Sequence, residues 1–399
     1  MKEFDVIVVG GGIHGAGVLQ AVVAAGHRAL LIEERAIAGG TSSRSSKLIH
    51  GGLRYLESGQ FALVRESLRE RAIHLRIAPS LVELKPFFIP VYRGTRRRPW
   101  QLKLGLWIYA LLGGFDPSTR FGTVPRSEWR FLDGIDTDGL ETVIRYSDAQ
   151  TDDARLTRAV VQSARSLGGE LAMPARFVAA TLEDDGVAVT YEHGGGRVLC
   201  RARVLVNAAG PWAPKVNQSI TPEIPIPAID LVQGTHIVVP IPISAGVYYV
   251  ENPADGRAVF IMPWHGGTMI GTTETPYQGE PEHVHPLPAE EEYLLGVARR
   301  YFPALREVTR EAITLRFAGL RVLPQASAAA FGRSRETIYC TDRPAKPRVI
   351  GIFGGKLTGW RAAAARVLEH IEPSLPAARR VAATEDLTLS EDLTLRSNT

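Results

Sequence analysis

A glycine-rich turn behind a short apolar run limits the folds that this chain can adopt more than any other feature. Residues 4–15 read FDVIVVGGGIHG, in which Gly10, Gly12 and Gly15 have the spacing GxGxxG between a predicted strand and a predicted helix. A second predicted strand ends at Glu33, 18 residues after Gly15. Such glycines let backbone N–H groups approach a pyrophosphate at a helix N-terminus, and the acid can hold ribose hydroxyls. The pattern predicts an α/β domain that binds a dinucleotide.

The composition is that of a globular protein with more than one core. The 399 residues exceed what one ordinary core holds, and two intertwined or sequential domains are expected. A net charge of +4 suits an anionic small molecule, nucleic acid or an anionic lipid surface, and does not choose among them. Two cysteines, Cys200 and Cys340, exclude a disulfide framework, and the first residues show no signal-peptide pattern. We therefore expect a cytoplasmic protein.

The predicted elements divide the nucleotide-binding part among three separate segments. The runs VAVTYEH and RVLCRARVLVNAAG, joined by three glycines, predict a hairpin, and residues 231–275 predict an antiparallel meander. A buried strand, RVIGIF, leads into a second glycine turn near the C-terminus. The expected division is a discontinuous nucleotide-binding domain (1–80, 143–218 and 344–375), an inserted antiparallel β-rich substrate domain (81–142 and 219–343) and a C-terminal tail (376–399). In that tail, the near-repeat EDLTLSEDLTLR predicts a frayed terminus or an edge hairpin.

The apolar stretch at residues 102–112 allows two interpretations. It follows Arg96, Arg97, Arg98 and Trp100, and it is too short to span a bilayer. One interpretation is a helix buried in the core. The other is an interfacial segment, with its cations and aromatic side chains at the level of lipid headgroups.

Two later segments favour a flavin over a nicotinamide. Ala209 and Gly210 follow a buried strand, where a small-small step brings the backbone close to a ligand. Gly355, Lys356, Leu357 and Thr358 lead into the last helix, whose N-terminus can stabilise negative charge on a reduced flavin.

Seven motifs, in order along the chain, carry a resemblance to a known family. They are SSKLIHGGLRYLE, YSDAQTDDARL, VNAAGPW, GTHIVVP, GTTET, the Gly319–Arg321 step and FGGKLTGWR. Together they resemble the FAD-dependent, respiratory-type glycerol-3-phosphate dehydrogenases over roughly residues 4–370. The resemblance implies a fold of the glutathione-reductase/amino-acid-oxidase type and FAD as cofactor.

The same resemblance implies an activity and a set of partners. The activity is oxidation of sn-glycerol 3-phosphate to dihydroxyacetone phosphate by hydride transfer to the flavin. Electrons then pass to a quinone or another acceptor, which would place the protein at the inner face of the cytoplasmic membrane. Peripheral membrane contact and a homodimer are left open, and neither a nucleic-acid partner nor a metal site is expected.

Site residues follow from the resemblance position by position. The implied FAD-binding residues are Gly10, Gly12, Gly15, Glu33, Ser42, Ser43, Ser46, Lys47, Ala209, Gly210, Gly355, Lys356, Leu357 and Thr358. The implied catalytic residues are His50, Arg54, Tyr55, His236, Arg321 and Lys356. Arg54, Arg321, Arg335 and Lys356 are the candidates for the substrate phosphate, because a phosphate monoester favours arginines in charge-assisted contacts. Either His50 or His236 can be the base.

The sequence departs from the family pattern in three places. The longer members carry a helical C-terminal domain, and a chain of this length is expected to be a short member that lacks it. Gly359 and Trp360 stand where the family has a threonine-tyrosine pair, and Glu274 stands where it often has aspartate. The roles of Glu274, Trp264 and His265 are left open. The alternative functions are a related flavoenzyme for another 2-hydroxy acid or an amine, and a non-catalytic FAD-binding protein.

Overall fold

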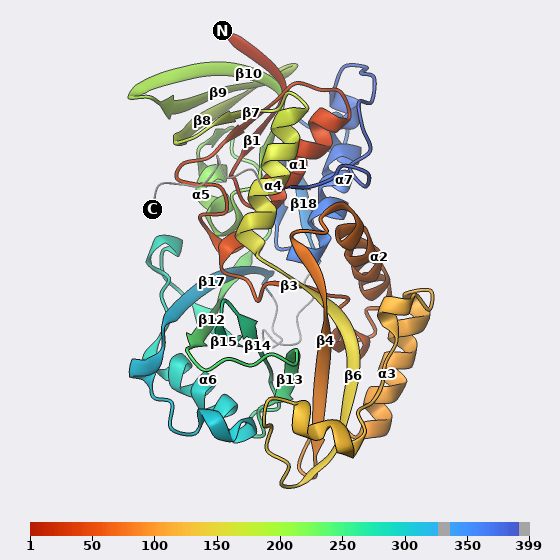
Figure 1. The fold of residues 1–399 in the computed structure, drawn as a ribbon. Coiled ribbons are helices and arrows are strands. Elements are labelled where there is room, and N and C mark those ends of the chain that lie inside the picture. Colours follow the sequence, from red (N-terminus) through yellow and green to blue (C-terminus); the bar gives the residue numbers. More distant parts are fainter. Residues whose placement is uncertain (326–335, 391–399) are drawn as a thin grey trace.

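Two sheets form the framework of the molecule, one above the other in Figure 1. The structure, a computed structural model, describes residues 1–325 and 336–390. In the upper sheet, β1 (Lys2–Val9) pairs in parallel with β2 (Ala29–Ile32) on one side and with β10 (Gly196–Asn207) on the other. The other strands of this sheet are β7 (Glu170–Ala172), β8 (Ala175–Glu183), β9 (Gly186–His193), β11 (Ile220–Thr221), β18 (Ile338–Thr341) and β19 (Val349–Phe353).

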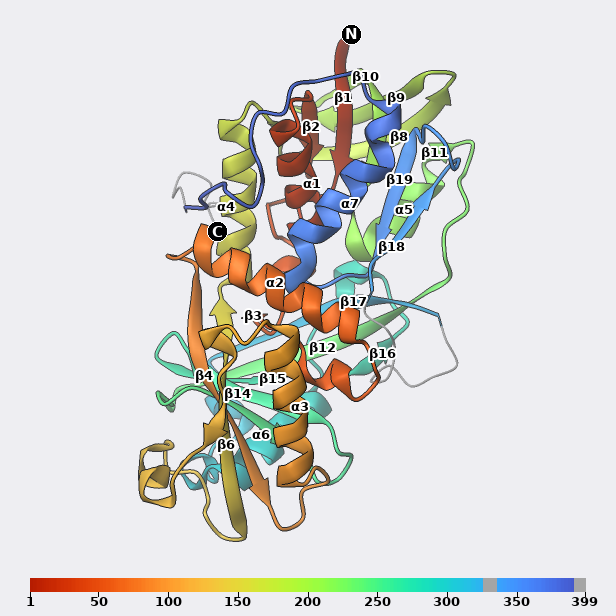
Figure 2. The same ribbon diagram turned by 90° about the vertical axis from the view of Figure 1, so that its right-hand side faces the viewer.

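Three helices cover one face of the upper sheet, as Figure 2 shows from the side. They are α1 (Ile13–Ala24), α4 (Asp153–Ser166) and α7 (Trp360–Ile371). Helix α1 lies between the other two and contacts both. A side chain on Gly17 would lie 2.7 Å from the ring of Trp360, so the small residues of α1 let α7 approach closely. Trp360 is fully buried in this contact, and the departure from the family pattern is therefore part of the core.

The lower sheet is built mainly from antiparallel strands. Its long strands are β4 (Val82–Tyr92), β6 (Leu140–Thr151), β12 (Ile229–Val239) and β17 (Leu315–Pro324). The shorter ones are β3 (Leu48–Ile49), β5 (Gly122–Thr123), β13 (Val247–Glu251), β14 (Ala258–Trp264), β15 (Gly267–Gly271) and β16 (Thr275–Tyr277). Helix α6 (Pro288–Tyr301) packs on this sheet through a cluster of buried aliphatic and aromatic side chains. The remaining helices are α2 (Phe61–Ile77), α3 (Pro99–Leu112) and α5 (Ala213–Gln218).

The α/β architecture with a β-rich second part is confirmed, and so is the hairpin of β9 and β10. The meander predicted for residues 231–275 is correct only for β13, β14 and β15. Strand β12 instead pairs with β15 and, over ten residues, with β17. The alternation of apolar and polar side chains along a strand shows which face is buried, but it does not show which strand is the neighbour. The partner β17 lies about 80 residues further along the chain.

The division into domains stays a proposal, and four strands lie outside their expected part. Two are short: β3 is in the lower sheet and β11 is in the upper sheet. Strand β6 belongs to the lower sheet, although residues 143–151 were expected in the nucleotide-binding part. Strand β18 pairs with β19 in the upper sheet, although residues up to 343 were expected in the substrate part. Strand β6 is long and runs towards the upper part (Figure 1), whereas the short β18 follows its partner β19 into the upper sheet.

Two further predictions concern the apolar stretch at residues 102–112 and the C-terminal tail. Helix α3 is buried on one face only, through Leu102, Leu106 and Tyr109. The described part of the C-terminal tail is neither frayed nor a hairpin, because it packs along α1 and α2. Val381 N donates to Ala24 O at 2.8 Å, and Leu389, almost fully buried, donates to Ile77 O at 2.7 Å.

Candidate functional site

A cavity of about 560 Å³ is lined by residues from both sheets. Its wall includes the first glycine turn, much of residues 39–55, parts of β12 and β17, and the second glycine turn at residues 354–358. Segments that are hundreds of residues apart in the sequence therefore face one space. The cavity is the candidate site.

The glycine turn has no room for side chains, so its backbone lies directly at the cavity. A Cβ atom on Gly15 would lie 1.9 Å from Gly10 O, and one on Gly10 would lie 2.7 Å from Ala208 O. Glu33 holds the turn in place: its carboxylate accepts from Gly11 N at 2.6 Å and from Arg35 N at 2.8 Å. Ala36 N donates to it as well, at 3.2 Å. A carboxylate has about four acceptor positions, so Glu33 keeps about one for a ribose hydroxyl.

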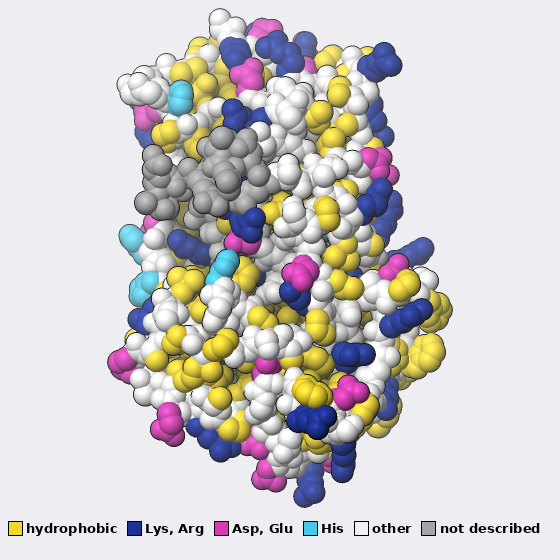
Figure 3. All heavy atoms as spheres, viewed as in Figure 1, with side chains coloured by type: hydrophobic (Ala, Val, Ile, Leu, Met, Phe, Trp, Pro, Cys, Tyr) yellow, Lys and Arg dark blue, Asp and Glu magenta, His cyan; other side chains and the backbone are white. Residues whose placement is uncertain are grey.

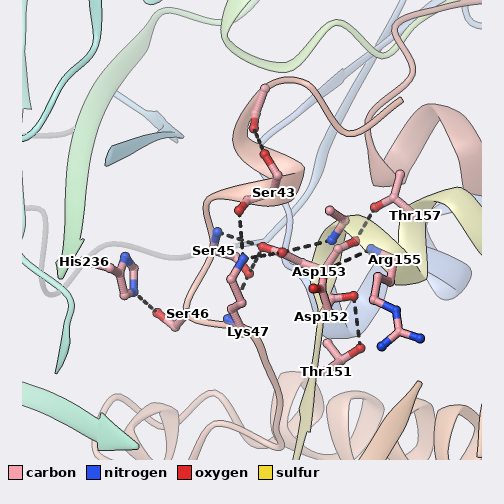
Figure 4. A network of polar contacts seen from close by, with 12 residues as sticks. Ser43, Ser45, Ser46, Lys47, Thr151, Asp152, Asp153, Arg155, Thr157 and His236 are labelled. Carbon is pink, nitrogen blue, oxygen red and sulfur yellow. Dashed lines mark hydrogen bonds and ion pairs between the residues drawn. The ribbon is translucent and has the colours of Figure 1, made fainter. Parts of the chain in front are cut away.

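The loop after β2 is fixed by a buried ion pair, drawn in Figure 4. Lys47 Nζ lies 2.5 Å from Asp153 Oδ1, at the start of α4, and donates to Ser43 O at 2.8 Å. Ser45 N and Oγ both donate to Asp153 Oδ2. The ammonium of Lys47 also lies over the ring of Trp264, at 5.3 Å from its centroid. Lys47 therefore anchors the loop to α4 and does not line the cavity.

His236 is a buried, neutral imidazole in the wall of the cavity. Its Nε2 lies 3.0 Å from Ser46 Oγ, and its ring stacks on Phe317 at 5.0 Å. Burial, with the nearby positive charges of Arg321 and Lys47, lowers the pKa of His236 well below its ordinary value. Its Nδ1 is buried and has no hydrogen-bond partner within the described chain.

His50 lies in a loop that is fixed from behind. Its backbone N donates to Thr358 Oγ1 at 3.1 Å, which ties it to the second glycine turn. The next residue, Gly51, donates to Tyr109 Oη at 3.0 Å, and Tyr109 in turn donates to buried Asp148 at 2.8 Å. A side chain on Gly51 would overlap the Tyr109 ring. The imidazole of His50 stays in the cavity wall, 6.4 Å from the ring of Phe260.

Three of the predicted cations line the same cavity. Lys356 Nζ lies 4.1 Å from the centroid of the Tyr55 ring, and the guanidinium of Arg54 lies 6.0 Å from that centroid. Arg321 donates to Glu274 Oε1 at 2.9 Å and to Thr272 Oγ1 at 3.0 Å. The strand pairing of β12 with β17 brings Arg321 near His236.

Most of the predicted site residues line the cavity. These are Gly10, Gly12, Glu33, Ser42, Ser46, His50, Arg54, Tyr55, Ala209, Gly210, His236, Arg321, Gly355, Lys356, Leu357 and Thr358. Gly15, Ser43 and Lys47 are not in its wall; Gly15 packs against the glycine turn, and Ser43 and Lys47 hold the loop. Trp264 and His265 pack against each other, with ring centroids 4.5 Å apart, and do not line the cavity either. Arg335 lies outside the described residues.

The wall also contains residues that the sequence interpretation did not name as site residues, among them His14, Tyr249, Arg257 and Phe260. His14 stands inside the GxGxxG motif, so its place in the motif was a usable signal. Burial lowers the pKa of His14 to about 4, and its buried Nε2 has no hydrogen-bond partner within the described chain. Nothing in the local sequence distinguishes Tyr249 and Phe260 from ordinary strand residues, or Arg257 from an ordinary loop residue.

The residues present fit the FAD that the sequence predicts. A close-packed glycine turn faces the cavity at the start of α1, and Glu33 lies beside it. Gly355 has no room for a side chain, since a Cβ atom would lie 2.5 Å from Cε1 of His14. Buried polar groups are normally hydrogen-bonded, and His14 Nε2 and His236 Nδ1 both belong to residues of this wall. A polar ligand in the cavity would lie next to both residues.

Comparison with protein families gives one match over most of the chain. The family described as FAD-dependent oxidoreductase (DAO) matches residues 5–365. The matched range includes all the residues that line the cavity. FAD is the cofactor of this family.

Individual relatives are similar over nearly the whole chain. D-erythritol 1-phosphate dehydrogenase from Brucella abortus is 36% identical, covering 93% of this chain and 74% of its own length. Aerobic glycerol-3-phosphate dehydrogenase from Escherichia coli is 35% identical, covering 94% and 74% respectively. The structure of a glycerol-3-phosphate dehydrogenase from Bacillus halodurans in complex with FAD matches with a TM-score of 0.75 at 25% identity, covering 99% of this chain and 69% of that one.

Proposed function

Because the chain belongs to the FAD-dependent oxidoreductase family, among its glycerol-3-phosphate dehydrogenase homologues, we propose that it oxidises sn-glycerol 3-phosphate to dihydroxyacetone phosphate. The observation that carries the proposal is that Arg54, Arg321 and Lys356 share one cavity wall with His50 and His236. A phosphate monoester has a charge of about −1.5 to −2 near neutral pH. A single carboxylate would need fewer cations, which counts against a 2-hydroxy acid as substrate.

Each cation contacts neighbouring side chains, which suits a site that must hold a phosphate in one place. Arg321 is oriented by Glu274 and Thr272. Lys356 lies over Tyr55, and Arg54 lies next to the same ring. Side chains that are already ordered lose less conformational entropy when the substrate binds. Arg54 and Arg321 would hold the phosphate, and Lys356 would hold the substrate and the cofactor together.

FAD, when bound, would supply the hydride acceptor for the central carbon of the substrate, and a quinone or another acceptor would then take the electrons. The hydroxyl proton of that carbon needs a base, and the two histidines differ in their ability to take it. Proton uptake at His236 is opposed by burial and by neighbouring cations. We therefore assign the base to His50 and give His236 the role of a neutral hydrogen-bonding group.

Aromatic side chains form part of the cavity wall. Phe87, Tyr146, Tyr249 and Phe260 contribute to its wall. Phe260 packs edge-on against Phe87 and Tyr249, at centroid distances of 6.3 and 5.3 Å. Such a wall excludes water and strengthens the charge interactions inside.

A second candidate substrate is D-erythritol 1-phosphate. The relative from Brucella abortus that acts on it is as similar to this chain as the glycerol-3-phosphate dehydrogenases are. Both substrates combine a phosphate with a secondary alcohol, so the same cations and base would serve either. Reduction of an artificial electron-acceptor dye tests the choice. We expect glycerol 3-phosphate to give the higher kcat/KM, whereas a higher value for the erythritol ester would favour the second candidate.

We also propose that α3 binds an anionic membrane surface. Trp100, Leu104, Trp107, Leu111 and Phe115 are each more than half exposed, and their spacing puts them on one face of the helix and its C-terminal end. Figure 3 shows yellow side chains at the right-hand edge of the lower half, where α3 lies. Arg93, Arg96 and Lys103 are exposed beside them. Within the described residues, α3 and the other helices are all too short or too polar to cross a membrane.

The chemistry of this α3 surface decides the kind of partner. Tryptophans and large aliphatic side chains flanked by cations match the interface between lipid tails and anionic headgroups. A quinone acceptor dissolved in the bilayer would then be near the protein. The membrane proposal and the substrate proposal stand on separate residues, so either can fail alone.

A further inference from the structure

Glu274 forms an ion pair with the arginine that the proposed substrate phosphate would need. Its Oε1 lies 2.9 Å from Arg321 Nη1, and its side chain is only 6% exposed. The carboxylate and the guanidinium both belong to the cavity wall. An anion that binds at Arg321 must therefore approach a resident negative charge.

The backbone around Glu274 is held in place, which makes the pair a lasting feature of the site. Arg257 Nη1 donates to Glu274 O at 3.2 Å. On either side, the hydroxyls of Thr273 and Thr275 donate to the carboxylate of Glu290, at 2.8 and 2.6 Å. Glu290 lies in the first turn of α6 and also accepts from Thr235 at 2.6 Å. The segment is thus tied to α6 and β12 together.

We propose that Glu274 is the resident counter-ion of Arg321 and competes with the substrate phosphate for it. The idea rests on the proposed function, because it takes Arg321 as part of the phosphate site. A half-buried guanidinium without a partner is costly, so Glu274 stabilises the protein before substrate binds. The same charge repels an incoming phosphate. Binding is then an exchange of partners, which sets a lower affinity and a faster release than Arg321 alone would give.

The test replaces the charge and keeps the hydrogen bond. In Glu274→Gln the amide oxygen can still accept from Arg321, and the shape is unchanged. Inorganic phosphate is titrated into the FAD-loaded protein, and the flavin absorbance and the melting temperature report binding. We expect Glu274→Gln to bind phosphate about tenfold more tightly, with a lower melting temperature that phosphate restores.

A matched control comes from another carboxylate of the same cavity. Glu282 accepts from Trp212 Nε1 at 2.8 Å and has no contact with Arg321 in the described chain. Glu282→Gln should leave the dissociation constant of phosphate within about twofold of the wild-type value. If the control tightened phosphate binding as much as Glu274→Gln, general charge in the cavity would explain the effect, and the specific role of Glu274 would be refuted.

The outcomes separate this inference from the proposed function. If the wild type binds phosphate and Glu274→Gln binds it equally or more weakly, the inference is refuted, and the proposed phosphate site is still supported. Absence of binding in both proteins counts against the phosphate site itself, and the inference falls with it. If Glu274→Gln fails to retain FAD, Glu274→Asp draws the charge back from Arg321, and roughly two- to threefold tighter binding is expected. Unchanged or weaker binding in that variant also refutes the competition.

Discussion

Ser46 Oγ lies 3.0 Å from His236 Nε2, and this contact joins the loop behind the first β-α unit to β12 of the lower sheet. The two residues are 190 positions apart in the sequence. The contact places a side chain of the expected cofactor loop directly on a side chain of the expected substrate region. Both sheets therefore contribute to the site, and a substitution on one side should alter the geometry on the other.

Arg321→Ala should weaken the binding of glycerol 3-phosphate far more than that of glycerol. Loss of a charge-assisted contact with the phosphate is expected to raise KM for the phosphate ester about 100-fold. Arg316→Ala is the control, since Arg316 lies on the same strand and pairs with Glu291 at 3.4 Å, outside the cavity. An equal loss for glycerol and its phosphate would remove Arg321 from the phosphate site.

His50→Gln should reduce kcat by about 10²- to 10⁴-fold, because the hydroxyl proton loses its acceptor. His236→Gln removes a neutral group whose pKa is already low, and its effect should fall mainly on KM. Steady-state dye reduction with each variant separates the two roles. A larger loss of kcat in His236→Gln than in His50→Gln would reverse the assignment.

His74 should make the protein sensitive to acid. It is fully buried on α2, with its ring 5.4 Å from that of Trp360, and burial together with Arg361 lowers its pKa to about 3. Between pH 6.5 and 3 the unfolded chain binds a proton at His74 that the folded chain does not, so stability falls as the pH falls. At pH 5 the loss is about 2 kcal/mol, and His74→Phe should abolish it.

Chemical denaturation of His74→Phe at pH 7 and pH 5 measures this effect. Between pH 7 and pH 5, the unfolding free energy of the wild type should fall by about 2 kcal/mol more than that of His74→Phe. His193→Phe is the control, because His193 is exposed in the hairpin of β9 and β10. An unchanged pH dependence in His74→Phe would show that other groups cause the acid sensitivity.

Replacing Trp107 and Leu111 by serine should abolish binding to vesicles that contain phosphatidylserine. Both side chains are more than half exposed on α3, so the fold should tolerate the change. Co-sedimentation at low and high salt measures the binding, and high salt should weaken it by screening the cations. Leu199→Ser, at an exposed position on β10, is the control. Wild-type binding that is indifferent to anionic lipid would contradict the membrane role of α3.

The parts of the fold that local chemistry decides could be predicted from the sequence. The GxGxxG turn, its flanking strands and the β9–β10 hairpin follow from glycine positions and apolar runs. The pairing of β12 with β17 could not be predicted, because residues on either strand look alike whichever neighbour they have. Helix α3 was ambiguous for a similar reason, since its composition is apolar on the buried and the exposed face alike.

The site shows the same limit in its side chains. Lys47 lies between Ser46 and Leu48, which line the cavity, yet its backbone has a positive φ of 59° and its ammonium reaches Asp153 instead. No local sequence pattern predicts this backbone conformation. Arg257 lies just before β14, and Glu274 lies between β15 and β16. Their places in the wall depend on how these short strands pair within the lower sheet.

The central claim is that this protein oxidises a phosphorylated polyol with its own FAD. Anaerobic mixing of the FAD-loaded protein with glycerol 3-phosphate tests it most directly, with D-erythritol 1-phosphate, glycerol and erythritol mixed in parallel. We predict rapid loss of the visible flavin absorbance with glycerol 3-phosphate, and little change with either unphosphorylated polyol. A flavin that stays oxidised with both phosphate esters would contradict the account.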